Sequence, residues 1–230
     1  PYVALLGVIS VLMLLEPHLS GTVLILCTGA VLMIVGGIQG WLVAVGIGGV
    51  GAMGFLFIKL AEKGIIKYGA ARIAMWHDPW LDYSGDGYQL AQSLITIGSG
   101  GLLGVGLGRS RQKFLYLPEQ YNDFIFSVVC EELGLIGACV IMLIFALLIL
   151  RGFWIALHAR DRFGALLAVG IMTHLALQTF LNIAVVSGFV PTTGISLPFF
   201  SYGGTALCLQ LVEMGIVLSV SRQIPAPKAG

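Results

Sequence analysis

The stretch KFLYLPEQYNDFIFSVVCEELG, residues 113–134, marks the point where a polar segment passes into a long apolar run. Leu117-Pro118 predicts a turn, and Asp123 follows it at the start of the apolar run. Glu131 and Glu132 fall inside that run. A carboxylate at the boundary between water and hydrocarbon, beneath a basic loop, is where a base acting on a lipid-borne polar substrate is expected.

The composition of the whole chain is that of an integral membrane protein. Of its 230 residues, 58% are hydrophobic and 10% charged, and the mean hydropathy is +0.98. A soluble domain carries about 25% charged residues, so we predict an all-α fold, a polytopic bundle of membrane helices. The four cysteines lie in apolar runs, and their spacing fits neither a disulfide framework nor a zinc site. We expect membrane lipid, and no nucleic acid, as a partner.

Six apolar runs are long enough, or nearly so, to cross about 30 Å of hydrocarbon at 1.5 Å per residue. They cover residues 1–15, 20–37, 41–60, 124–150, 163–188 and 203–221. We therefore predict one membrane domain over residues 1–230, with a long loop at 61–123 and a second loop at 189–202 on the same side. The chain begins inside an apolar run at Pro1, with no signal-peptide pattern, and is interpreted as the later part of a longer protein.

Basic residues in short loops predict the orientation of the bundle. The loop at 151–162 is flanked by Arg151, Arg160 and Arg162. The last span is followed by Arg222 and Lys228. The positive-inside rule places both segments, and so both ends of the chain, in the cytoplasm. The 61–123 loop is then extracytoplasmic, although it carries Lys63, Lys67, Arg72, Arg109, Arg111 and Lys113. Six basic residues held outside favour an anionic ligand.

Two segments of the 61–123 loop have recognisable patterns. Residues 88–97 (YQLAQSLITI) predict a short amphipathic helix whose uncharged polar face is Gln89, Gln92, Ser93 and Thr96. This helix either lies on the outer leaflet or packs within the protein. Residues 98–108 (GSGGLLGVGLG) either form a flexible hinge or present backbone N–H groups to a phosphate.

A polar stripe on the fifth predicted span points to the interior of the bundle. His174, Gln178 and Asn182 recur at i, i+4 and i+8, and such a stripe would be costly against lipid. Its side chains either form interhelical hydrogen bonds or line a substrate cavity. The second outer loop contains two prolines and three glycines and is expected to pack against the 61–123 loop. Ser201 of this loop is a further candidate for the cavity.

Four segments together resemble one family of proteins. They are RIAMWHDPW (72–80), GYQLAQSL (87–94), GLGRSRQKFLYLPEQYNDFIFSVVCEELG (106–134) and PTTGISLPFFSYGG (191–204). They resemble the SEDS family, the shape, elongation, division and sporulation proteins of FtsW/RodA type. The resemblance implies a ten-span bundle in the bacterial cytoplasmic membrane, of which this chain supplies spans five to ten. It also implies peptidoglycan glycosyltransferase activity on lipid II, in complex with a class B penicillin-binding transpeptidase.

The resemblance also assigns roles to residues. Asp123 matches the acidic residue of the LPE-x-x-x-DF motif that is regarded as catalytic, and Arg72, Lys113 and Glu119 fall on characteristic positions. The chain departs from the family at Glu16-Pro17-His18, where an aspartate is usual in place of His18.

The chemistry of such a transfer needs one base and several cations. Pyrophosphate leaves well once its charge is neutralised, so protonation by a second carboxylate is unnecessary. We expect Asp123 to take the proton of the acceptor's 4-hydroxyl. The pyrophosphate would be held by Arg72, Lys113, Arg109 and Arg111. No ligand cluster predicts a metal site, although Mg²⁺ or Mn²⁺ could assist the pyrophosphate.

Alternative interpretations concern the three acids. Asp123 is also well placed to cap the following helix. Glu131 and Glu132 lie eight and nine residues after Asp123 and are expected about 12–13 Å deeper, with a structural role for Glu132 and a cavity position for Glu131. A transporter or flippase could use Glu131, Glu132 and His174 as a proton path. A non-catalytic scaffold for the transpeptidase is the third interpretation.

Overall fold

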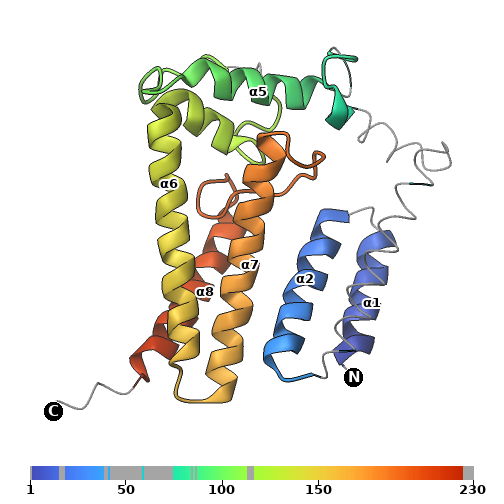
Figure 1. The fold of residues 1–230 in the computed structure, drawn as a ribbon, viewed down its shortest axis with the longest axis vertical. Helices are drawn as coiled ribbons and strands as arrows, with labels where there is room; N and C mark the ends of the chain where they lie inside the picture. Colours follow the sequence, from blue (N-terminus) through green and yellow to red (C-terminus); the bar gives the residue numbers. More distant parts are fainter. Residues whose placement is uncertain are drawn as a thin grey trace.

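The computed structural model describes residues 2–15, 19–38, 41, 59, 75–83, 85, 87–112 and 117–224. In these residues the chain is all-helical, without strands. Its helices are α1 (Tyr2–Leu15), α2 (Leu19–Val35), α5 (Tyr88–Gly100), α6 (Ile125–Leu157), α7 (Arg162–Val186) and α8 (Gly204–Arg222), arranged as in Figure 1. Outside the described residues lie His18, Arg72, Lys113, Lys228 and, apart from Trp41 and Lys59, the predicted span 41–60.

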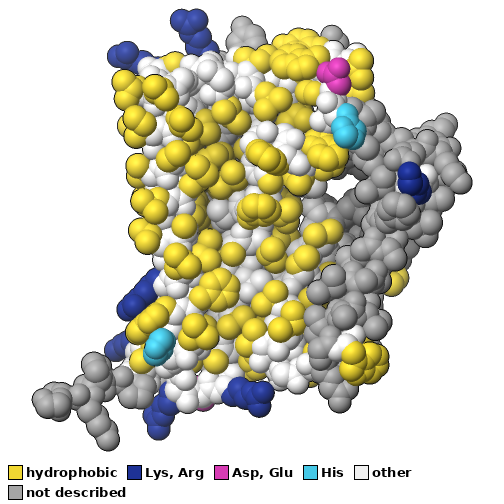
Figure 2. Space-filling view, viewed as in Figure 1, with side chains coloured by type: hydrophobic (Ala, Val, Ile, Leu, Met, Phe, Trp, Pro, Cys, Tyr) yellow, Lys and Arg dark blue, Asp and Glu magenta, His cyan; other side chains and the backbone are white. Residues whose placement is uncertain are grey.

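Three of the described helices, α6, α7 and α8, are long and apolar enough to cross a membrane. Helices α1 and α2 are apolar but shorter, with 14 and 17 residues. Among the described residues, three of the six predicted spans are therefore matched by full-length helices and two by short ones. Figure 2 shows hydrophobic side chains over the middle of the molecule and most basic side chains toward its two ends, as expected of a membrane-spanning bundle.

Helices α6 and α7 run antiparallel and are joined by a short connection, with α8 packed beside them (Figure 1). Asp161 begins α7, since its Oδ2 accepts a hydrogen bond from the Gly164 N–H at 2.8 Å. The predicted boundary at Leu150 was wrong, because α6 continues to Leu157. Arg151 does not end the helix: its guanidinium lies over the Trp154 ring, 4.1 Å from the ring centre, so its charge is accommodated within the helical turn.

Helix α6 is bent at Gly134, whose backbone is non-helical (φ 67°, ψ −172°). A side chain there would overlap the main chain of Leu102 and Gly104, so glycine permits a close approach between backbones. The first part of α6 lies across the end of the bundle beneath α5 (Figure 1). Glu131 and Glu132 are in this first part. The expectation that they lie 12–13 Å deeper than Asp123 was therefore wrong, because it assumed a straight helix.

Helix α5 covers the segment for which a short amphipathic helix was predicted. Its polar face is turned into the protein: Ser93 and Thr96 have no exposed surface. The Ser93 hydroxyl donates to the Val186 carbonyl at 2.7 Å and lies 2.7 Å from the Ser127 hydroxyl. These contacts tie α5 to α6 and α7 and support the interpretation in which this helix packs within the protein.

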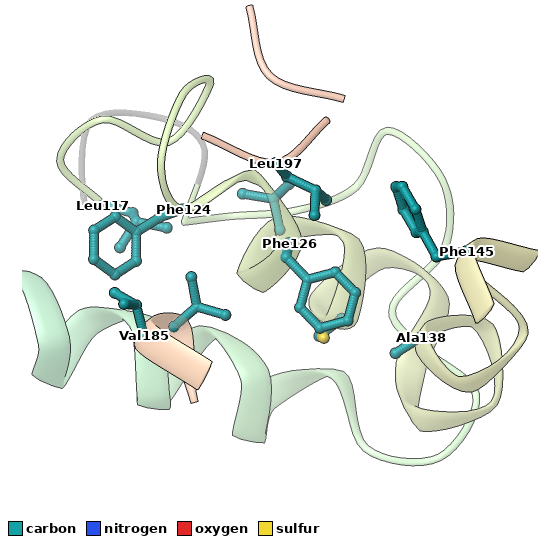
Figure 3. Packing of buried hydrophobic residues seen from close by; sticks show 10 residues of the cluster. Leu117, Phe124, Phe126, Ala138, Phe145, Val185 and Leu197 are labelled. Carbon is teal, nitrogen blue, oxygen red and sulfur yellow. The ribbon is translucent and has the colours of Figure 1, made fainter. Parts of the chain in front are cut away.

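A hydrophobic cluster fixes the start of α6. Figure 3 shows Leu117 and Phe124 beside Val185 of α7, and Leu197 of the α7–α8 connection above Phe126. Phe124 is 1% exposed. Asp123 precedes Phe124 directly, so this buried ring holds the main chain of the acid in place.

Candidate functional site

Asp123 lies in a pocket of about 220 Å³ at the end of the bundle where α7 joins α8. The pocket is formed by the start of α6, the α7–α8 connection and the first turns of α8. Its lining residues are Asn122, Asp123, Gly194, Ser196, Leu197, Ser201, Tyr202, Gly203, Ala206, Leu207 and Gln210. Of the residues predicted to form the site, the pocket therefore brings together Asp123 and Ser201.

The main chain around Asp123 is held by the α7–α8 connection. The Ser201 hydroxyl donates to the Asn122 carbonyl at 2.7 Å, and the Tyr202 N–H donates to the Tyr121 carbonyl at 2.7 Å. The predicted packing of the second outer loop against the 61–123 loop is thus confirmed at these residues.

The carboxyl group of Asp123 does not cap the helix that follows it. The N-cap residue of α6 is Phe124 and no side chain caps the helix, so the interpretation of Asp123 as a cap was wrong. Partial burial raises the pKa of the Asp123 carboxyl above its usual range, and the nearby negative charge of Glu119 raises it further. A higher pKa makes the carboxylate a stronger base at neutral pH.

Glu119 is exposed at the approach to this carboxyl and does not line the pocket. Its Oε2 accepts a hydrogen bond from the Asn122 amide at 2.7 Å. Direct substrate binding by Glu119 stays a prediction, and its charge also raises the pKa of the Asp123 carboxyl.

The polar stripe of α7 supports the pocket from behind without lining it. Asn182 is fully buried and its amide donates to the carbonyls of Asp123 and Ile195, each at 2.7 Å. Gln178 donates to the Ser196 carbonyl at 3.0 Å, and His174 is half-buried. The stripe faces the interior as predicted. Asn182, Gln178 and His174 do not line the Asp123 pocket, and the amides of Asn182 and Gln178 satisfy loop carbonyls.

Glu131 also lies outside the pocket. It is 2% exposed, and its carboxylate accepts hydrogen bonds from the Ser110 hydroxyl and from the Arg111 N–H. Glu132 accepts the N–H groups of Gly108 and Ser110, at 2.9 and 3.3 Å. The cavity position predicted for Glu131 was wrong, because its oxygen atoms hold a loop.

The same contacts weigh against the phosphate cradle, one of the two interpretations of residues 98–108. Several of its N–H groups donate to carbonyl oxygens of the protein, and that of Gly108 donates to the Glu132 carboxylate. Arg109 and Arg111 belong to this region, are exposed and do not line the pocket. No lysine or arginine lines the pocket within the described part of the chain. The other two cations, Arg72 and Lys113, lie outside that part.

Comparison with known proteins agrees with this arrangement. The family model FTSW_RODA_SPOVE, described as cell cycle protein, matches residues 1–225. The chain belongs to this family.

Relatives within the family carry descriptive names. Stage V sporulation protein E of Bacillus subtilis is 49% identical over 176 residues, which are 76% of this chain and 47% of that protein. A probable peptidoglycan glycosyltransferase FtsW of Geobacter sulfurreducens is 42% identical over 226 residues, which are 97% of this chain and 59% of that protein. The chain thus spans about half the length of these relatives.

Solved structures share the fold. One is described as "Structural coordination of polymerization and crosslinking by a peptidoglycan synthase complex"; the match covers 98% of this chain and 62% of the other, with a TM-score of 0.76 and 28% identity. The rod shape determining protein RodA of Thermus thermophilus matches with a TM-score of 0.61 and 27% identity, covering 98% of this chain and 56% of that one. The bundle is therefore of the family's type.

Tyr202 and Gln210 are among the pocket residues that were not predicted as site residues from the sequence of this family member. Tyr202 is 86% exposed, and Gln210 lies one and a half turns inside α8. The Gln210 side-chain oxygen accepts the Phe199 N–H at 2.8 Å, which positions the turn above the pocket. For Gln210 the sequence did contain a signal: an uncharged amide in an apolar span usually faces the interior of a bundle.

Proposed function

We propose that the protein is a peptidoglycan glycosyltransferase that polymerises lipid II into glycan strands, with Asp123 as its general base. The names of the relatives support the reaction class. The observation that carries the assignment is the Asp123 carboxyl itself, which faces a pocket, has a raised pKa and does not cap the helix that it precedes.

The reaction is a single displacement at the anomeric carbon of the donor sugar. Asp123 takes the proton of the acceptor's 4-hydroxyl, and that oxygen forms a bond to the anomeric carbon as the bond to pyrophosphate breaks. Undecaprenyl pyrophosphate leaves with the bonding electron pair, and the configuration at the anomeric carbon inverts. One base suffices because the leaving group needs charge neutralisation and no protonation.

In this proposal Arg72 and Lys113 neutralise the pyrophosphate, Arg by paired hydrogen bonds and Lys as a point charge. Arg109 and Arg111 are removed from that role because they do not line the pocket. Among the described residues no three His, Cys, Asp or Glu side chains gather as metal ligands. A divalent cation such as Mg²⁺ or Mn²⁺ would depend on pyrophosphate and water for its ligands, and no step is assigned to it.

The partner and orientation belong to the same proposal. A similar solved structure is described as a complex that coordinates polymerisation and crosslinking, which favours a class B penicillin-binding transpeptidase as the partner. Helix α1 begins and α8 ends at the same end of the bundle as the α6–α7 connection (Figure 1). Arg160 and Arg162 lie at that connection, so we place it on the cytoplasmic side and Asp123 on the outer side.

The transporter interpretation is weakened by the contacts of the two glutamates. A proton path needs carboxylates that exchange protons with successive partners, whereas those of Glu131 and Glu132 accept hydrogen bonds from loop N–H and hydroxyl groups. His174 is three helical turns from the Asp123-facing end of α7 and has no hydrogen bond to either acid within the described residues.

The test is a polymerisation assay with the purified full-length gene product and fluorescent lipid II in detergent. We expect glycan polymer with the native protein and none with Asp123→Asn. Asp161→Asn is the matched control: it changes the same residue type at the opposite end of the bundle and retains a side-chain oxygen for the cap of α7. Polymer from Asp123→Asn would refute the base assignment. No polymer from the native protein, with lipid II movement across sealed vesicles, would favour a transporter.

A further inference from the structure

The loop formed by residues 101–111 exposes a row of large apolar side chains. Leu102, Leu103 and Leu107 are 66%, 80% and 76% exposed, and Val105 is 40% exposed. Exposed leucine on a membrane helix is ordinary, but a loop in water is usually polar. The row therefore indicates a hydrophobic environment around this loop.

The hydrogen bonding of the backbone in the 101–111 loop is compatible with a hydrophobic environment. Most of its N–H groups have acceptors inside the protein, chiefly the carbonyl and carboxylate oxygens of Glu131 and Glu132. Irregular backbone is tolerated near hydrocarbon only when its polar groups are satisfied by the protein. The two glutamates thus satisfy the loop from its protein side, and its leucines point away.

The exposed row is continuous with the apolar surface of a membrane-crossing helix. The Leu135 N–H donates to the Gly101 carbonyl at 2.9 Å, and the Ile136 N–H donates to the Leu102 carbonyl at 3.2 Å. Leu135 and Ile136 are each 55% exposed and begin the long straight part of α6. The leucines of the loop therefore lie where the hydrocarbon-facing surface of α6 begins.

Two cations follow the leucines at the far end of the loop. The side chains of Arg109 and Arg111 are exposed, and neither guanidinium has a hydrogen-bond or ion-pair partner among the described residues. The carboxylate oxygen atoms of Glu131 and Glu132 accept hydrogen bonds from main-chain N–H groups and from the Ser110 hydroxyl. Figure 2 shows basic side chains extending beyond the hydrophobic surface at this end of the molecule.

We propose that the 101–111 loop anchors the protein in the membrane interface and binds anionic phospholipid. Its leucines insert among the acyl chains, and Arg109 and Arg111 extend to the lipid phosphates. Long basic side chains reach outward in this way from apolar surfaces. This proposal does not depend on the glycosyltransferase assignment, since it uses no residue of the Asp123 pocket.

The first experiment measures the lipid preference of the full-length gene product by native mass spectrometry, with phosphatidylglycerol and phosphatidylcholine offered in equal amounts. A basic residue near an anionic surface contributes about fivefold in affinity, so Arg109→Gln with Arg111→Gln should lower phosphatidylglycerol retention about 25-fold. Arg109→Lys with Arg111→Lys retains the charge and should retain the preference. Equal retention by the Gln and native forms would overturn the anionic part of the proposal.

The second experiment reports the surroundings of the loop directly. A Leu103→Cys form is labelled with an environment-sensitive fluorophore in phosphatidylglycerol nanodiscs, after Cys27, Cys139 and Cys208 are replaced by alanine; Cys130 is buried. We expect quenching by lipids that carry a nitroxide near the headgroup and protection from aqueous iodide. Quenching by iodide would overturn the anchor. Protection from both quenchers would also overturn it, by showing that protein covers the loop.

Discussion

The side-chain amide of Asn182 donates a hydrogen bond to the main-chain carbonyl of Asp123 at 2.7 Å, across 59 residues of sequence. The same amide donates to the Ile195 carbonyl at 2.7 Å. One buried residue of α7 therefore joins the segment that carries the candidate base to the loop that forms the opposite wall of its pocket. Because both carbonyls depend on it, Asn182 positions the Asp123 main chain without touching substrate.

Replacing Asn182 by leucine should destabilise the protein and lower activity. The substitution leaves the buried Ile195 carbonyl and the partly buried Asp123 carbonyl without their donor, which costs about 3 kcal/mol. We expect a lower Tm in detergent and reduced lipid II polymerisation. Thr173→Val on the same helix is the control, since the Thr173 hydroxyl is buried without a hydrogen-bond partner within the described residues and its removal should be neutral or stabilising. Equal effects of the two substitutions would contradict this role.

The pH dependence of stability should report the environment of Asp123. Its folded pKa is raised, so the native state holds this proton more tightly than the unfolded state does. Stability from this group is greatest below the unfolded pKa and falls as the pH rises through the folded pKa. Relative to Asp123→Asn, the native protein should therefore lose Tm as the pH rises through that window. Parallel Tm curves for the two proteins would show that burial does not penalise the carboxylate.

Glu119→Gln should move the acid limb of the pH–activity profile. Glu119 raises the pKa of the Asp123 carboxyl, so its neutralisation allows Asp123 to ionise at lower pH. Polymerisation should then persist to more acidic pH than in the native protein. Glu119→Asp keeps the charge and should keep the acid limb near its native position. An unchanged pH–activity profile of Glu119→Gln would show that the charge of Glu119 does not affect the pKa of Asp123.

Gly134→Ala should disrupt the bend of α6. The residue has φ of 67°, and a Cβ would overlap the Gly104 main chain, so the cost should be at least about 2 kcal/mol. We expect a clear loss of Tm and weaker accumulation of protein in the membrane. Gly215→Ala is matched to it, because a Cβ at this position in α8 meets nothing within 4 Å. That substitution should be neutral or stabilise by about 1 kcal/mol.

Composition and apolar periodicity were sufficient for much of the architecture. The ends of α7 and α8 fall within about two residues of the predicted spans, because an apolar run long enough to cross hydrocarbon has few alternatives to a helix. The inward orientation of the polar stripe on α7 was also predicted, because polar side chains are costly against lipid. The bend at Gly134 could not be predicted this way, since a glycine inside an apolar helix is usually tolerated without a break.

The local pattern around Asp123 left both a helix cap and a base open, and the family resemblance of the LPE-x-x-x-DF motif favoured the base. Which residues surround that acid depended on contacts between segments distant in sequence. The carboxylates of Glu131 and Glu132 meet the 101–111 loop only because α6 bends, and that loop then takes Arg109 and Arg111 away from the pocket. Burial and hydrogen-bond partners arise only when distant segments pack together. The tertiary structure therefore decided that Asp123 lines a pocket, whereas Glu131 and Glu132 hold a loop.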